Sequence, residues 1–129
     1  MVKKGMKKDC KQECPLRELL TRLGDKWSIL VIYTLAQAPQ NRARFSELRR
    51  AIEGISQRML TTTVRHLERD GILTRKVFPV IPPRVDYALT PLGKDLLKPV
   101  ENLVEWVEGN WEKIEKSRGT FDQLHKDKK

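Results

Sequence analysis

The pattern of hydrophobic residues changes at Gly71, and this change limits the folds that the chain can adopt. Between Ser56 and Gly71, the apolar residues recur with the spacing of an amphipathic helix. After Gly71, residues 72–78 and 84–89 alternate side chains in the manner of half-buried β-strands. The proline-rich segment 79–83 separates these strands and cannot continue their hydrogen-bond ladder. We therefore predict a helix followed directly by a β-hairpin with a rigid tip.

The predicted helix after Ser56 has two chemically different faces. Its apolar face consists of Leu60, Thr63, Val64 and Leu67. Its other face consists of Arg58, Thr61, Thr62, Arg65 and Arg69, with no carboxylate among them. A solvated face usually mixes both signs of charge, whereas cations and hydroxyls together supply donors for phosphate oxygens and guanine edges. The pattern indicates a helix that binds DNA.

Three shorter helices are expected before this one. Pro15 suits a first helical position, and the helix that it opens ends at Gly24. Asp25 is a favourable N-cap for a second helix, which breaks at Ala38–Asn41. A third, short helix ends at Gly54.

A long helix is expected from Pro91 to about residue 117, followed by a polar, frayed tail at 118–129. Pro99 is expected to kink this helix because it removes one hydrogen bond. The apolar positions form two rows, which is more than one small domain has to bury, so a dimer interface is favoured over an intramolecular core. The predicted interface residues are Leu97, Val100, Leu103, Val104, Trp106, Val107 and Trp111.

Composition agrees with one globular domain that has an anionic partner. The chain has 129 residues, of which 39% are hydrophobic, enough for one core. Its net charge of +9 favours nucleic acid or an acidic membrane. The cations concentrate in residues 42–86, with ten Lys or Arg against five Asp or Glu. We divide the chain into a flexible basic arm (1–13), a folded domain (14–117) and the tail.

The sequence also bears on location and chemistry. The longest apolar run, residues 29–33, is too short to span a bilayer, and the N-terminus lacks the apolar run of a secretory signal. We expect a cytoplasmic protein with no membrane partner. Two cysteines and two distant histidines make no recognisable metal site, and no cofactor is expected. The sequence shows no base paired with a cysteine, as a thiol enzyme would need, so no enzymatic activity is expected.

The order of the predicted elements is that of a winged helix-turn-helix, mainly α with a small β-hairpin wing. The sequence resembles the HxlR family of bacterial and archaeal transcriptional regulators, which are relatives of MarR-type proteins. The resemblance covers about residues 14–115 and implies a homodimeric, operator-binding regulator, usually a repressor, with the terminal helices in the dimer interface. It rests on Cys14-Pro15, Leu23–Trp27, Arg44–Arg49, Gly54–Leu60, Leu67–Gly71, Pro82–Tyr87 and Leu89–Gly93.

We predict two sets of residues that contact double-stranded DNA. The recognition-helix set, whose first turn would touch base edges, is Ser56, Gln57, Arg58, Thr61, Thr62 and Arg65. The backbone set, on the wing and at the entrance to the motif, is Arg75, Lys76, Arg84, Arg44 and Arg49. The alternative for the hairpin cations is simple solubilisation. The alternative for the whole chain is a winged-helix module that binds protein and does not recognise DNA sequence.

Cys14 and Cys10 leave the control of DNA binding open. Cys14 lies just before a predicted helix N-terminus, where the helix dipole can stabilise a thiolate. Such a thiol can release DNA by forming a disulfide or by adding to an electrophile. A packed, unreactive cysteine is an equal alternative. Cys10 departs from the usual single-cysteine pattern, and a Cys10–Cys14 bond would compete with a bond between subunits. The sequence does not identify the effector, and an oxidant, an electrophile and a small ligand remain the alternatives.

Overall fold

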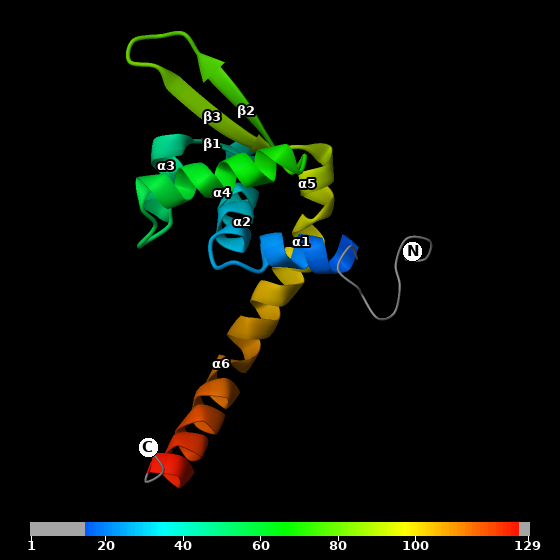
Figure 1. Cartoon of the computed structure of the whole chain (residues 1–129), viewed down its shortest axis with the longest axis vertical. Helices are drawn as coiled ribbons and strands as arrows, with labels where there is room; N and C mark the ends of the chain where they lie inside the picture. The colour runs from blue at the N-terminus through cyan, green and yellow to red at the C-terminus, as the bar shows by residue number, and fades with distance from the viewer. Residues whose placement is uncertain (1–14, 127–129) are drawn as a thin grey trace. The chain divides into compact units, whose positions relative to one another are not determined.

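The structure is a computed structural model that describes residues 15–126. It forms two compact units, one ending at Leu97 and the other beginning at Lys98. The predicted N-terminal arm and both cysteines lie outside the described residues. The first unit contains α1 (Pro15–Leu23), α2 (Ser28–Gln37), a 3-10 turn η1 (Pro39–Asn41), β1 (Arg42–Arg44), α3 (Phe45–Ala51), α4 (Gln57–Arg69), β2 (Leu73–Phe78), β3 (Arg84–Leu89) and α5 (Pro91–Asp95) (Figure 1). The second unit is the greater part of α6 (Leu97–His125).

Side chains that accept backbone N–H groups mark the starts of α2 and α4. The Asp25 carboxylate accepts hydrogen bonds from the backbone N–H groups of Trp27 and Ser28, each at 2.8 Å, which agrees with the predicted capping role. Ser56 caps α4 through its hydroxyl, which accepts the N–H of Met59 at 3.0 Å. Gly54 has a φ of 88°, which lets the chain turn between α3 and α4. The three helices bury Val31, Ile32, Leu35, Leu48, Leu60, Val64 and Leu67.

The sheet has three antiparallel strands in the order β1-β3-β2, one more than we predicted. The additional strand, β1, has only three residues, Arg42–Arg44, and pairs with the central strand β3. Its two arginines are exposed and only Ala43 is buried. Three residues are too few to establish an alternating pattern, so this strand depends on its partner and could not be found from periodicity.

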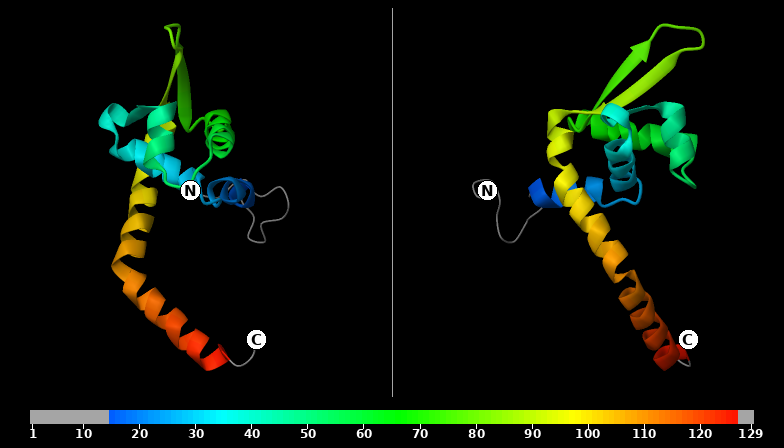
Figure 2. Two further views of the ribbon diagram at one scale, coloured as in Figure 1. Left: turned by 90° about the vertical axis from the view of Figure 1, so that its left-hand side faces the viewer. Right: turned by 180° about the vertical axis from the view of Figure 1, so that it is seen from behind.

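The predicted hairpin forms the wing of the first unit. Strands β2 and β3 pair from Leu73 opposite Leu89 to Phe78 opposite Arg84, so residues 79–83 connect their far ends. The views in Figure 2 show the hairpin extending beyond the helices of this unit. At its base, Thr90 donates a hydrogen bond to the carbonyl of Gly71 at 2.6 Å and caps α5 by accepting the N–H of Gly93 at 2.9 Å.

The long terminal helix differs from the prediction in two ways. It is interrupted at Leu96, which separates α5 from α6. Pro99 explains this position, because its ring excludes the carbonyl four residues earlier, that of Asp95, from helical bonding. The helix also continues to His125, whereas we predicted fraying after Ser117. Within the described residues, no helix is long and apolar enough to cross a membrane.

Candidate nucleic-acid interface

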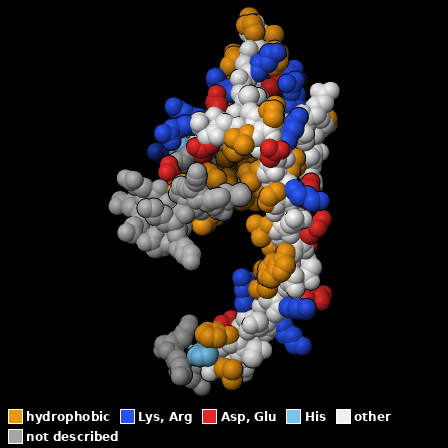
Figure 3. Space-filling view, turned by 90° about the vertical axis from the view of Figure 1, so that its right-hand side faces the viewer, with side chains coloured by type: hydrophobic (Ala, Val, Ile, Leu, Met, Phe, Trp, Pro, Cys, Tyr) orange, Lys and Arg blue, Asp and Glu red, His pale blue; other side chains and the backbone are white. Residues whose placement is uncertain are grey.

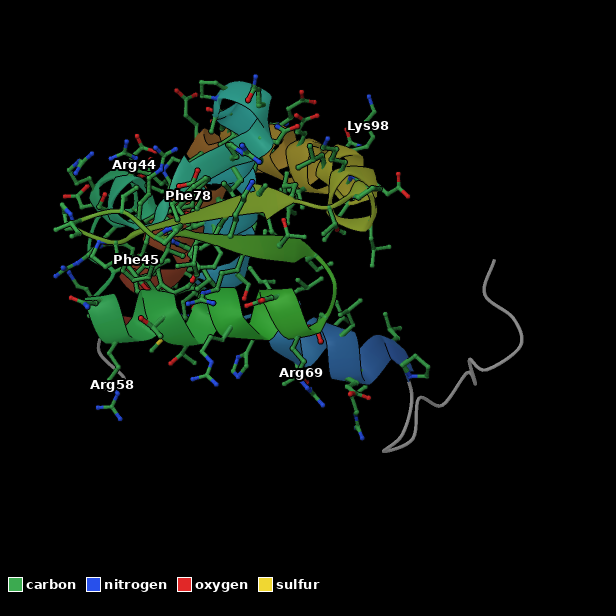
Figure 4. The ribbon with its side chains drawn as sticks, turned by 90° about the horizontal axis from the view of Figure 1, so that it is seen from above. Arg44, Phe45, Arg58, Arg69, Phe78 and Lys98 are labelled. Carbon is green, nitrogen blue, oxygen red and sulfur yellow. The ribbon has the colours of Figure 1, made fainter. Side chains whose placement is uncertain are left out.

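Helix α4 separates its side chains as the sequence predicted. Leu60, Val64 and Leu67 are fully buried, and Thr63 is 3% exposed. The opposite face, with Arg58, Thr61, Thr62, Arg65 and Arg69, is exposed throughout. Figure 4 shows Arg58 extending away from the body at the start of α4 and Arg69 near its other end. The helix therefore presents a surface about 18 Å long, at roughly 1.5 Å per residue, that consists mainly of cations and hydroxyls.

Several polar side chains at the start of α4 already form hydrogen bonds with other groups of the protein. The Ser56 hydroxyl accepts the N–H of Met59, so its acceptor capacity supports the helix. The Thr61 hydroxyl donates to the carbonyl of Gln57 at 2.8 Å, which leaves the oxygen lone pairs as acceptors. The side-chain oxygen of Gln57 lies 3.4 Å from a guanidinium nitrogen of Arg49 on α3. Arg49, which we predicted to bind phosphate, is thus placed to orient Gln57.

A hollow of about 420 Å³ separates α4 from the wing. Arg65 lines it from α4 and Arg75 lines it from β2, with Thr61, Glu68 and Tyr87 completing the walls. Tyr87 is 5% exposed, and burial raises the pKa of its hydroxyl while Arg75 opposes that shift. Two arginines that belonged to separate predicted sets therefore border one hollow. Its two guanidinium groups, against the single carboxylate of Glu68, can donate hydrogen bonds to a phosphate group of a DNA backbone.

The cations of the wing divide between its two sides. Arg75 is opposite Tyr87 in the register and borders the hollow beside α4. Lys76 is the next residue along the strand, so its side chain points to the other face of the sheet. Asp86 lies at the centre of that other face, between Lys76 on β2 and Arg44 on β1. The predicted backbone set is therefore not one continuous surface.

Arg84 also lies on this second face, where it pairs with Asp86. Its Nε and Nη2 atoms donate to the two carboxylate oxygens of Asp86 at 2.9 and 3.0 Å. Its guanidinium also lies 4.8 Å from the centre of the Phe78 ring, and the Lys76 ammonium lies 5.1 Å from the same ring. Because Arg84 hydrogen-bonds to its carboxylate, the pKa of Asp86 lies below the ordinary value. We predicted that Arg84 binds phosphate, but its contacts are those of a residue that holds the wing together.

Sequence reasoning missed the roles of Asp86 and Phe78. Asp86 is 2% exposed, which is unusual for a carboxylate unless it is paired. A signal was present, because residues two apart on a strand share one face and Arg84 and Asp86 have this spacing. Phe78 could be connected with them only through the register, which places it directly opposite Arg84.

Helix α6 carries all seven residues predicted for a dimer interface, and four of their side chains are exposed. The exposed fractions of Leu103, Trp106 and Trp111 are 51, 58 and 41%. Val107 is also exposed, Leu97 and Val104 are half-buried, and Val100 is buried within the single chain. Phe121 and Leu124, which are 58 and 71% exposed, continue the apolar surface beyond the predicted end of the helix. They were not predicted because we expected the helix to end near Ser117.

Two further predictions concern the cysteines and a metal site. Cys10 and Cys14 lie outside the described residues, so the structure adds nothing about their surroundings. Within residues 15–126, no group of three or more metal-binding side chains gathers in one place.

The fold and sequence are similar to those of known regulators. Residues 22–115 match the family described as HxlR-like helix-turn-helix. The HTH-type transcriptional regulator YtfH of Escherichia coli is 41% identical over 99 residues, which cover 77% of this chain and 76% of YtfH. The solved structure of the putative transcriptional regulator ytfH from Salmonella typhimurium has a TM-score of 0.79 at 37% identity and covers 88% of this chain and 98% of its own. The redox regulator HypR in its reduced form has a TM-score of 0.71 at 38% identity. The match covers 79% of this chain and 98% of the HypR chain. The predicted winged-helix fold is confirmed.

Proposed function

Because the chain belongs to the HxlR-like helix-turn-helix family and is a transcriptional regulator of the HTH type, we propose that it binds a specific DNA operator as a homodimer and acts as a repressor. The exposed face of α4 carries this proposal. It combines Arg58, Arg65 and Arg69 with threonine hydroxyls and lies directly opposite a fully buried face. A helix held in this way can enter a major groove without disturbing the core.

The contacts divide by chemistry. Arg58 and Gln57, in the first turn of α4, are placed to touch base edges, and Thr61 and Thr62 follow them. Arg65 and Arg75 bind a phosphate at the hollow between α4 and the wing. Arg44 and Lys76 supply positive charge on the other side of the sheet, whereas Arg84 pairs with Asp86 and stabilises the wing.

Dimerisation is proposed through the exposed apolar surface of α6. Leu103, Trp106 and Trp111 are large apolar groups that a second copy of the helix can cover. Two copies of α4 then bind two half-sites of a pseudo-palindrome, about one helical turn or a multiple of it apart. Repression follows when the occupied operator blocks RNA polymerase, which requires nothing beyond DNA binding.

Thiol chemistry is the proposed means of release. HypR, which is 38% identical, is described as a redox regulator. In the sequence Cys14 directly precedes Pro15, the first residue of α1. A helix dipole stabilises the thiolate of a cysteine at a helix N-terminus, which is the chemistry that we propose for this thiol. Oxidation to a disulfide, or addition to an electrophile, then lowers the affinity for the operator.

Selection of duplexes from a random pool, followed by footprinting, tests the proposal. We expect a two-fold symmetric consensus and a salt-dependent affinity. Failure to bind any duplex at low salt would contradict DNA binding and favour a protein-interaction module. The same assay with and without diamide, on wild type, Cys14→Ser and Cys10→Ser, tests the control. Release that persists in both cysteine variants would reject the thiol mechanism.

A further inference from the structure

The tip of the wing exposes apolar side chains at its outermost point. Ile81 is 99% exposed and its neighbour Val80 is 52% exposed. Both lie in the loop 79–83, the part of the hairpin farthest from its base (Figure 1). A single exposed aliphatic residue is ordinary on a protein surface. This one differs because its whole side chain projects from a narrow element beside a DNA-binding helix.

The loop that carries Ile81 is stiff. Prolines at positions 79, 82 and 83 restrict its backbone, and the N–H of Val80 donates to the carbonyl of Phe78 at 2.8 Å. Below the loop, the Phe78 ring contacts both Arg84 and Lys76. Since the loop is already ordered, inserting it between surfaces costs little conformational entropy.

The charge below the tip indicates what kind of partner it meets. Figure 3 shows hydrophobic side chains at the end of the wing with Lys and Arg side chains beneath them. Arg44 and Lys76 are exposed on this side of the sheet, whereas Arg84, which lines the hollow under the loop together with Val80 and Ile81, is paired with Asp86 and adds little charge. An apolar tip above cations fits a nucleic-acid groove, where phosphates border an interior that can accept an apolar side chain.

The reach of the wing selects the minor groove. From Arg75 to Phe78, strand β2 runs about 10 Å further, at roughly 3.3 Å per residue, and the loop 79–83 extends beyond it. A minor groove is about 6 Å wide, which this length can cross. Arg65 and Arg75 border the hollow between α4 and the base of the wing, where we placed a phosphate. A wing that passes this phosphate extends over the adjacent minor groove.

We propose that Ile81 is an apolar wedge that enters the minor groove beside each half-site and partly unstacks one base step. The proposal rests on the DNA-binding function proposed above and adds a specificity-determining residue to it. Apolar wedges of this kind kink DNA by roughly 20–90°. Flexible pyrimidine–purine steps kink most easily, and guanine places an amino group in the minor groove. The wedge therefore favours A·T pairs, TA steps above all, at a position that α4 does not touch.

The test uses a duplex that the wild-type protein selects from a random pool. At each flanking A·T pair in turn, 2,6-diaminopurine replaces adenine and adds an amino group to the minor groove. We expect one such substitution to weaken wild-type binding and to leave Ile81→Ser unaffected. Ile81→Ser itself should bind roughly tenfold more weakly, which corresponds to the loss of one buried aliphatic side chain. Energy transfer between end-labelled strands should report bent DNA with wild type and straighter DNA with this variant.

Two matched variants complete the design. Val77→Ser removes an aliphatic side chain that is 47% exposed on the same hairpin but lies within β2, and we expect less than a twofold change. Ile81→Leu keeps an apolar tip and should keep both the affinity and the bend. Because Ile81 has almost no contacts, thermal unfolding should be the same in wild type, Ile81→Ser and Ile81→Leu.

Three outcomes would overturn the proposal. The first is equal sensitivity of wild type and Ile81→Ser to every diaminopurine substitution. The second is a straight duplex in the wild-type complex. The third is an Ile81→Ser protein that binds and bends DNA normally but no longer represses a reporter, which would assign the tip to a protein partner. If wild type selects no duplex at all, the DNA-binding function fails and the wedge fails with it.

Discussion

Helix α4 and the wing both carry arginines, but they use them in different ways. Within the described residues, the guanidinium of Arg58 on α4 has no hydrogen bond or ion pair to protein, so its donors are available to a ligand. On the wing, Arg84 gives two hydrogen bonds to the buried Asp86 and packs on Phe78. Formal charge therefore overstates what the wing offers to phosphate. The helix supplies free donors, and the wing supplies a braced support for its tip.

The largest effect is expected from Arg58→Ala. Loss of a bidentate base contact should weaken operator binding by about 1–3 kcal/mol and relax the preference at one base pair. Binding-site selection with the variant measures both. Arg69→Ala, at the other end of the same face, serves as the control and should weaken all sequences alike. A consensus that Arg58→Ala leaves unchanged would show that Arg58 does not contact a base.

A smaller effect is expected from Arg75→Ala. This arginine borders the hollow beside α4, where we place a phosphate, so its loss should lower the slope of log affinity against log salt by about one unit. Titrations at several salt concentrations measure the slope. The base preference should remain that of wild type. An unchanged slope would show that Arg75 does not bind a phosphate at the hollow.

Arg84→Ala distinguishes the two uses of a cation. The variant leaves the Asp86 carboxylate buried without its donors, so we expect a lower melting temperature, whereas the salt slope should change less than in Arg75→Ala. Arg84→Lys keeps the charge but not the paired geometry and should not restore the melting temperature. A normal melting temperature with a reduced salt slope would show that Arg84 binds phosphate, as the sequence predicted.

The smallest effect concerns pH. The pKa of Asp86 is lowered in the folded protein, so its ionised form contributes stability that is fully present above the ordinary value of 3.8 and is lost as the pH falls through the folded value. Wild type should melt at a higher temperature than Asp86→Asn at neutral pH, and this difference should shrink below about pH 4. Melting curves from pH 7 to pH 2.5 measure it. A difference that is constant over this range would show that the charge of Asp86 does not contribute.

Much of the fold follows from short-range patterns. The caps at Asp25 and Ser56 were predictable because each side chain bonds to an N–H within three residues. Strand β1 was not predictable, because its pairing partner Tyr87 is more than forty residues away from Ala43. The interruption at Leu96 follows from Pro99, but its effect lies one turn earlier than the proline itself.

The sequence by itself determined which face of α4 is buried and which is exposed, since helical periodicity is a local property of the chain. It also determined the family, through motifs that occur in the same order and at similar spacing. Only the tertiary structure decided which cations are free to bind. The register of the sheet encloses Asp86 between Arg44 and Lys76 and sets Phe78 opposite Arg84, so that the neighbouring Arg84 on the same strand is held by a buried carboxylate, whereas packing of the wing beside α4 places Arg75 near Arg65. Availability of a charge depends on its neighbours in space, and those neighbours are set by long-range pairing.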